Sequence, residues 1–293
     1  MPRFQSIDLS TLPAPSIIEN LDFATIKALM AADFIARDPA FTALLESDPA
    51  IKVLEACAYR ELLLRQRIND AVRSCMLATA ADTNLDNVAS LVGTVRLVAA
   101  DGTVESDARL RMRTQLALES FSTCGPIGAY LYQIFSTSLD IADASVFMSE
   151  PGTVRVTVLA TTAASTDHYG TPAQVLLDQV AARLNADDVR PLTDVVQVRA
   201  PQIVHYNIAA AITLYYGPDS TAVQAAVQRV LAAYVQRTSR LGYNVTLPGL
   251  YAALQQSGVE TSVISSPAQS IITDPTQATF CDGIAVTVAG RDQ

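Results

Sequence analysis

The stretch "AIKVLEACAYRELLLRQRINDAVRSCMLAT", residues 50–79, carries the most regular pattern in the chain. Apolar or small residues recur in steps of three and four, which is the spacing of one face of a helix. The preceding "ESDPA" offers Ser47 or Asp48 as an N-cap and puts Pro49 in the first turn. The sequence therefore predicts one long helix from about residue 50 to residue 79.

The apolar face of this helix forms a seam that only Glu61 interrupts. We expect the other members of the seam to pack against a neighbouring helix: Leu54, Cys57, Leu64, Ile68, Ala71 and Cys75. The arginines of this stretch lie off the seam. The spacing alone fits two arrangements, a core helix of its own domain or a helix shared with a partner protein.

The sequence on both sides of this helix also predicts helical structure. Residues 1–20 hold three prolines and no period, which is typical of an extended arm. A helical pattern follows from Phe23 to Leu45. After the long helix, "DTNLDNVASLVG" is typical of a short capped helix that ends at Gly93, and "VESDARLRMRTQLALESF" predicts a helix that starts at Ser106 or Asp107. We therefore expect a helical domain over residues 21–121.

From residue 122 onward, strand patterns alternate with helical ones. Two stretches resemble each other, because Gly128 and Tyr130 in "IGAYLYQIF" match Gly249 and Tyr251 in "PGLYAAL". Each is followed by a strand that ends near Ser and Pro, and then by a strand of Val and Thr. The expected fold class is α+β: an N-terminal helical domain with a long partner-binding helix, then two similar small α+β modules at 122–201 and 202–293.

Composition excludes several classes of ligand. The net charge is -9, only 17% of residues are charged, and the isoelectric point is near 4.7. Nucleic acids and anionic membranes require clustered Lys and Arg, so neither is an expected partner. The apolar run "IAAAITLYY" is shorter than the roughly 18 residues of a membrane helix. The four cysteines form no CxxC pair, and the N-terminus has no secretory h-region, so we expect synthesis in a reducing cytoplasm.

The sequence shows no convincing catalytic or metal-binding arrangement. Cys124 lies before "GPIG" at a predicted helix start, but a cysteine nucleophile needs a base nearby. The chain has only His168, in a polar loop, and His205, in a predicted strand. "DTNLD" imitates a calcium loop but lacks its glycine and final glutamate, and "NADDVRPLTD" is typical of a helix exit and turn. We expect no catalytic residue, no metal and no cofactor.

Several long segments together resemble the bacteriophage baseplate assembly protein J family, and they occur in the same order along the chain. They include residues 54–93, "ALESFSTCGPIGAYLYQIF", "LNADDVRPLTDVVQV", "VHYNIAAAITLYYGPD" and "LPGLYAALQQSGVE". The resemblance runs from about residue 15 to the C-terminus. It implies a structural baseplate component of a contractile phage tail or of a phage-tail-like particle such as an R-type bacteriocin.

The resemblance also implies partners. Family members resemble wedge proteins that pair as two copies with one baseplate assembly protein I type partner through bundled N-terminal helices. Six such wedges then surround the tube and spike, next to a lysozyme-like wedge protein and other baseplate and tail proteins. The resemblance implies no known catalytic site, and it favours the interpretation in which the long helix is shared with a partner.

Two other functions remain to be considered. An enzyme using a cysteine, or a small-molecule-binding module, would use a cleft between the two α+β modules; a ligand-induced thermal shift or a loss of activity in Cys124→Ser would support it. A sheath, tube or portal subunit would form polymers or rings from the chain alone. A wedge component, in contrast, is expected to need its partner.

Overall fold

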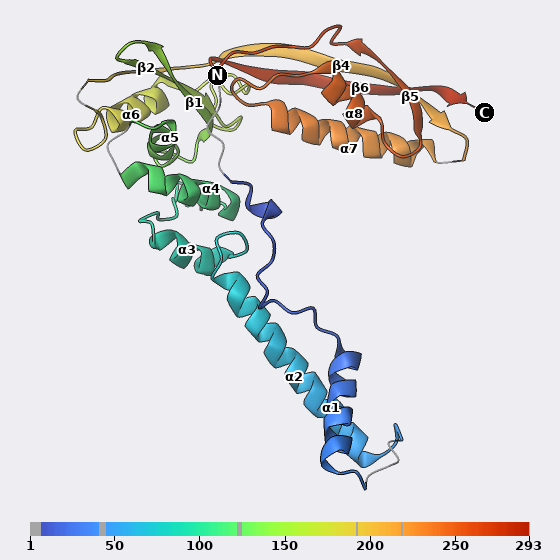
Figure 1. Cartoon of the computed structure of the whole chain (residues 1–293). Coiled ribbons are helices and arrows are strands. Elements are labelled where there is room, and N and C mark those ends of the chain that lie inside the picture. The colour runs from blue at the N-terminus through green and yellow to red at the C-terminus, as the bar shows by residue number, and fades with distance from the viewer. Residues whose placement is uncertain (1–6, 41–44, 122–124, 192, 218, 293) are drawn as a thin grey trace. The chain divides into compact units, whose positions relative to one another are not determined.

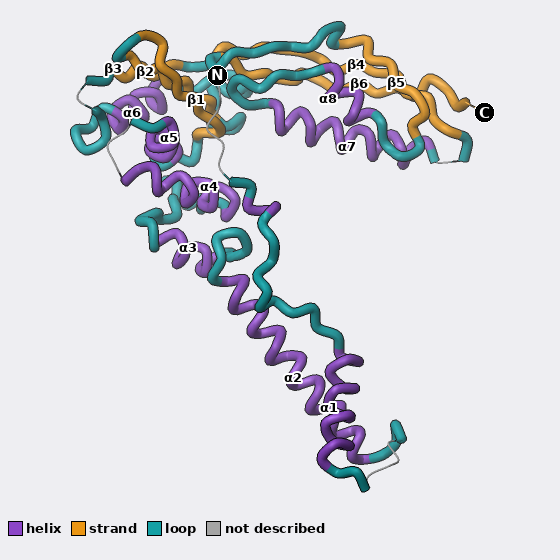
Figure 2. The backbone as a smooth tube through the Cα atoms, in the orientation of Figure 1, coloured by secondary structure: helices purple, strands orange, loops and turns teal. Residues whose placement is uncertain are grey.

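The computed structural model describes residues 7–40, 45–121, 125–191, 193–217 and 219–292. Its overall class is α+β, with helices and two three-stranded sheets. The chain divides into two compact units, Met1–Arg96 with Glu105–Gln115, and Leu97–Val104 with Leu116–Gln293 (Figure 1). The first is helical, and the second contains both sheets (Figure 2).

The long helix forms where the sequence predicts it. The helices of the first unit are α1 (Phe23–Arg37), α2 (Pro49–Ser74), α3 (Asp82–Ser90) and most of α4 (Asp107–Ala117), with a short 3-10 turn, η1 (Leu9–Thr11). Asp48 is the N-cap of α2 and accepts from the backbone N–H of Ala50. The helix ends at Ser74, before the predicted end near residue 79.

The earlier end of α2 has a tertiary cause. Arg111 of α4 donates to the backbone carbonyls of Leu77 and Ala80, at 2.7 and 2.6 Å. The Thr79 hydroxyl donates to the carbonyl of Arg73. These side chains hold the segment after Ser74 in turns instead of a further turn of α-helix.

Helix α1 packs along the N-terminal half of α2 (Figure 1). Ile26 of α1 and Ile51 and Ala58 of α2 are buried at this contact. Lys27 and Glu55 form an ion pair across it, with 2.7 Å between Nζ and Oε1. The side chains of Lys27 and Lys52 lower the pKa of the Glu55 carboxyl through hydrogen bonds.

The part of the helical unit around α3 and α4 is stabilised by a small apolar core and by arginine side chains. Ala80, Leu85, Ala89 and Leu110 are fully buried there. Glu105 and Arg113 form a buried ion pair, with 2.6 Å between Oε2 and Nη1. Arg113 also donates to the carbonyl of Val95. This network connects the segment before α4 with α4 itself.

The second unit begins with η2 (Leu118–Phe121) and α5 (Ile127–Phe135), followed by β1 (Ile141–Glu150), β2 (Thr153–Ala160), α6 (Gln174–Leu184) and β3 (Val195–Arg199). The sheet order is β1-β2-β3. β1 and β2 are antiparallel neighbours, whereas β2 and β3 run parallel and are joined through α6.

The second sheet belongs to β4 (Gln202–Tyr215), α7 (Ser220–Thr238), α8 (Leu247–Leu254), β5 (Val259–Ser266) and β6 (Gln277–Asp292). Its order is β5-β4-β6, with β5 antiparallel and β6 parallel to the central strand. Alternate residues of β4 form the core beneath the sheet: Tyr206, Ile208, Ala210, Ile212 and Leu214. Helices α7 and α8 lie on this face (Figure 1).

The two sheets agree only partly with the predicted similarity. In each, a helix with the G-x-Y pattern precedes a strand that is antiparallel to the central strand, and Gly128 and Gly249 both lie in the first helical turn. The predicted match between the two Val- and Thr-rich strands, β2 and β6, is wrong. β2 is the central strand of its sheet, while β6 is an edge strand that does not pair with β5. Alternating Val and Thr indicate a half-buried strand but do not encode its neighbours.

Within the second unit, the loop 161–172 connects β2 to α6 and packs against the second sheet. Its Tyr169 ring packs edge-on against His205 and Phe280, with centroid distances of 4.6 and 4.8 Å. Leu159 of β2 is buried together with Leu241 and Ala278. These side chains occupy the space between the two sheets in which a ligand cleft would have to lie.

We expect Gly249→Ala to lower the free energy of unfolding by about 1–3 kcal/mol, because an added methyl overpacks the contact between α7 and α8. A Cβ at Gly249 would lie 2.6 Å from the Tyr234 hydroxyl and 2.9 Å from the Thr246 Oγ1. Urea unfolding measures the loss. Gly290→Ala is the matched control, since a Cβ there meets nothing within 4 Å. Equal stability of the two variants would contradict the expectation.

Candidate functional site

One face of helix α2 packs against other segments of its own unit. Residues on this face are buried or half-buried and recur in steps of four and three: Ile51, Glu55, Ala58, Leu62, Arg65, Asn69 and Val72. Its first half meets α1, and its second half meets the N-terminal arm. The Asn69 side chain accepts from the backbone N–H of Glu19 (3.1 Å) and donates to its carbonyl (2.9 Å). Arg65 also pairs with the Glu19 carboxylate at 3.0 Å.

The predicted seam lies on the adjacent face. At about 100° per residue, its centre is roughly 110° around the helix from the internal face. Leu64 is 66% exposed and Ile68 is 53% exposed. Cys57, Ala71 and Cys75 are exposed as well, and Leu54 is half-buried. Apart from Leu54, these seam side chains are left exposed by the part of the chain that the structure describes, and the core-helix interpretation does not explain this exposure.

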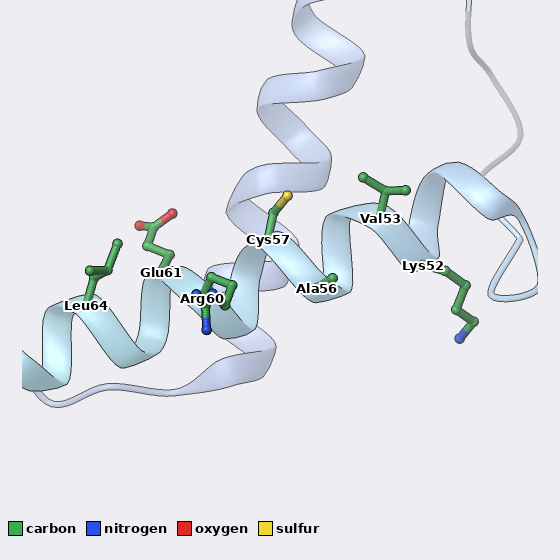
Figure 3. Close-up of a pocket in the computed structure, with 7 residues that line it drawn as sticks. All are labelled: Lys52, Val53, Ala56, Cys57, Arg60, Glu61 and Leu64. Atoms are coloured by element: carbon green, nitrogen blue, oxygen red, sulfur yellow. The ribbon is translucent and has the colours of Figure 1, made fainter.

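A shallow apolar depression marks the N-terminal part of the seam. It is lined by Lys52, Val53, Ala56, Cys57, Arg60, Glu61 and Leu64. Figure 3 shows Val53, Cys57, Glu61 and Leu64 on one side of α2, while Lys52 and Arg60 point to the other. Val53 is 62% exposed and extends the seam, although it was not among the predicted seam residues. Its spacing of four from Cys57 was a signal that could have identified it.

The one charge in the seam, the carboxylate of Glu61, has a cationic partner within the helix. Arg65 donates from Nε to Oε1 of Glu61 at 2.8 Å, one turn further along α2. The carboxylates of Glu61 and Glu19 raise the pKa of the Arg65 guanidinium through their hydrogen bonds. A neighbouring helix can therefore approach Glu61 without meeting an uncompensated carboxylate.

Within the described part of the chain, the histidines considered as catalytic bases are not assembled into a site. Cys124 lies outside the described residues. His168 is in the loop 161–172, and His205 is hydrogen-bonded through Nδ1 to Asp282 at 2.9 Å. Burial raises the pKa of the Cys281 thiol, which is the opposite of what a nucleophile needs.

Acidic residues of the two stretches singled out in the sequence, one as an imperfect calcium loop and one as a helix exit and turn, have structural partners. Asp82 and Asp86 lie in α3 rather than in a loop, and Asp86 pairs with Arg96 at 2.6 Å. Asp188 pairs with Arg183, and Asp194 accepts from the Tyr130 hydroxyl. Among the described residues, no three His, Cys, Asp or Glu side chains are grouped so that they could hold a metal. The same residues include no helix with the length and apolar character needed to cross a bilayer.

Comparison with known proteins gives consistent matches. The model of the baseplate J-like N-terminal domain matches residues 46–103, which contain α2, and the model of the baseplate J-like central domain matches residues 122–200. Baseplate protein J of Escherichia phage P2 is 40% identical over 304 residues, covering 98% of this chain and 99% of that protein.

A solved structure is also similar. It is a chain of the anti-feeding prophage baseplate, 6-fold symmetrised, determined by cryo-electron microscopy. The TM-score is 0.42 at 16% sequence identity, and the match covers 61% of this chain and 42% of that chain. The likeness is too distant to support a conclusion about this chain.

Proposed function

The chain belongs to the baseplate J-like protein family, and from this membership we propose that it forms part of the baseplate wedge of a contractile tail. It is a structural baseplate protein and not an enzyme, and its place is in the tail of the particle.

The uncovered apolar seam of α2 is the observation that carries the proposal. Two copies of the chain and one protein I type partner would place their N-terminal helices together, so that Leu64, Ile68 and their neighbours become buried. An exposed leucine gains about 1.5–3 kcal/mol on full burial, so several such residues support a stable interface. The helical domain at 21–121 would then bind partners within the wedge.

The two α+β modules, at 122–201 and 202–293, would contact other baseplate and tail proteins. Six wedges would surround the tube and spike, next to a lysozyme-like wedge protein. The junction between the sheets is packed by Leu159, Leu241 and Ala278, so no observation favours a ligand cleft there.

A complementation experiment tests this function. A phage or tail particle lacking the gene is expected to yield no contractile particles with a baseplate, as judged by negative-stain electron microscopy. The wild-type chain supplied in trans should restore these particles, and the titre should rise by several orders of magnitude. Particles with complete baseplates in the absence of the chain would contradict the proposal.

A further inference from the structure

Two arginines beside the α2 seam form no ion pair within the described part of the chain. Arg60 and Arg67 are both exposed. Lys52, Arg65 and Arg73, the other cations of α2, each pair with a carboxylate. In a chain of net charge -9, acidic groups outnumber basic ones, yet these two guanidinium groups have no carboxylate beside them.

The local sequence explains why these arginines are unpaired. On a helix, a side chain meets those three and four residues away. The four side chains at these distances from Arg60 are uncharged: Ala56, Cys57, Leu63 and Leu64. Arg67 has Asp70 three residues away. The Asp70 carboxylate instead accepts from Gln66 at 2.8 Å and pairs with Arg73 at 3.6 Å. A carboxylate for Arg60 and Arg67 therefore has to come from outside the helix.

Arg60 and Arg67 form one flank of the seam. At about 100° per residue, they lie roughly 40° and 60° around the helix from Leu64, on the side away from the internal face. Their spacing of seven residues places them two turns apart along the same side of α2. Arg60 also lines the apolar depression, and Figure 3 shows it pointing away from Leu64. A helix that packs on the seam would pass beside both guanidinium groups.

The same charges disfavour a second α2 as the occupant of the seam. In a parallel pair, Glu61 would face Glu61 of the other copy, and Arg60 would lie beside Arg65 of the other copy. In an antiparallel pair, the same flank of each helix would meet, so the arginines would face one another. Both arrangements bring like charges together, which costs affinity. A helix with carboxylates along its facing flank avoids this repulsion.

From this geometry we propose that the α2 seam binds an amphipathic helix of another protein, with Asp or Glu side chains two turns apart opposite Arg60 and Arg67. The inference rests on the proposed function, because it names the chemistry of the wedge partner at the same seam. In such a wedge, the seam of each copy faces this acidic helix and not the seam of the second copy. Apolar burial supplies most of the affinity, and the arginine–carboxylate pairs select the partner.

Two designed peptides test the charge preference on the full-length chain. Both are four-heptad helices with leucine at the apolar positions, and their flanking positions carry glutamate in one peptide and lysine in the other. Fluorescence anisotropy of the labelled peptides should show at least tenfold tighter binding of the acidic peptide in about 50 mM salt. In about 0.5 M salt the two affinities should approach each other, because salt screens exposed charges.

Charge reversal in the chain is the variant test. Arg60→Glu with Arg67→Glu should reverse the preference, so that the basic peptide binds at least tenfold tighter. Leu64→Asp should abolish the binding of both peptides, which locates the binding on the seam. Arg73→Glu is the matched control, because it makes the same change on α2 about 180° around the helix from Leu64 and should keep the acidic preference. Circular dichroism of every variant shows that the fold is retained.

Several outcomes would overturn the proposal: equal binding of the two peptides by the wild-type chain, no binding of the acidic peptide, or an unchanged preference in the double variant. A dimer of the isolated chain that Leu64→Asp dissolves would do so as well, because a second copy would then occupy the seam.

The complementation experiment separates this inference from the proposed function. The double variant Arg60→Glu with Arg67→Glu should lower the titre at least a hundredfold relative to the wild-type chain. A wild-type chain that restores no baseplates contradicts the function, whereas a double variant that restores them as well as the wild type contradicts only the acidic partner.

Discussion

Replacing Leu64 by aspartate is expected to abolish the proposed complex between the chain and a protein I type partner. In a shared helix bundle, Leu64→Asp would bury an unpaired carboxylate, at a cost of several kcal/mol. Such a loss dissolves an association in the micromolar to nanomolar range. Light scattering after co-expression measures the mass of the complex. The isolated variant should stay folded, because Leu64 is 66% exposed.

Leu63→Asp is the matched control for this prediction. It makes the same substitution one residue away, at a leucine that is 41% exposed but outside the seam. We expect it to change the affinity by less than about 1 kcal/mol. Arg65, which the sequence alone presents as a surface residue, is unsuitable because it pairs with Glu19 and Glu61. A wild-type complex with Leu64→Asp would show that the seam is not the interface.

Replacing Arg113 by alanine is expected to lower the free energy of unfolding by about 3–5 kcal/mol. The Glu105 side chain is fully buried and the Arg113 side chain is 3% exposed. Removing the guanidinium takes away the close partner of Glu105 Oε2 and a donor to the carbonyl of Val95. Urea unfolding, followed by circular dichroism, measures the loss.

The control is Arg73→Ala, which removes an arginine from an exposed pair with Asp70. That pair lies at 3.6 Å with side chains 47% and 61% exposed, so we expect a change within about 0.5 kcal/mol. A double variant, Glu105→Gln with Arg113→Met, should recover part of the stability, because it removes both charges of the buried pair. Similar losses in Arg113→Ala and Arg73→Ala would contradict the buried-pair interpretation.

Local chemistry was sufficient to predict where α2 begins, whereas the partner-binding role of its seam stays a prediction. Asp48 and Pro49 set the start of the helix, because capping and proline act within a single turn. The seam was visible because side chains three and four apart share a face in any helix. The α+β class followed in the same way, from the change in hydrophobic period near residue 122.

Only the tertiary structure decided which face of α2 is covered, where α2 ends and which strand lies at an edge. Periodicity identifies a face but not its partner, because burial depends on segments far away in the chain. Glu19 meets Asn69 across fifty residues, and Arg111 reaches back to Leu77 and Ala80. For the same reason, the edge position of β6 appears only once β4 is seen between β5 and β6.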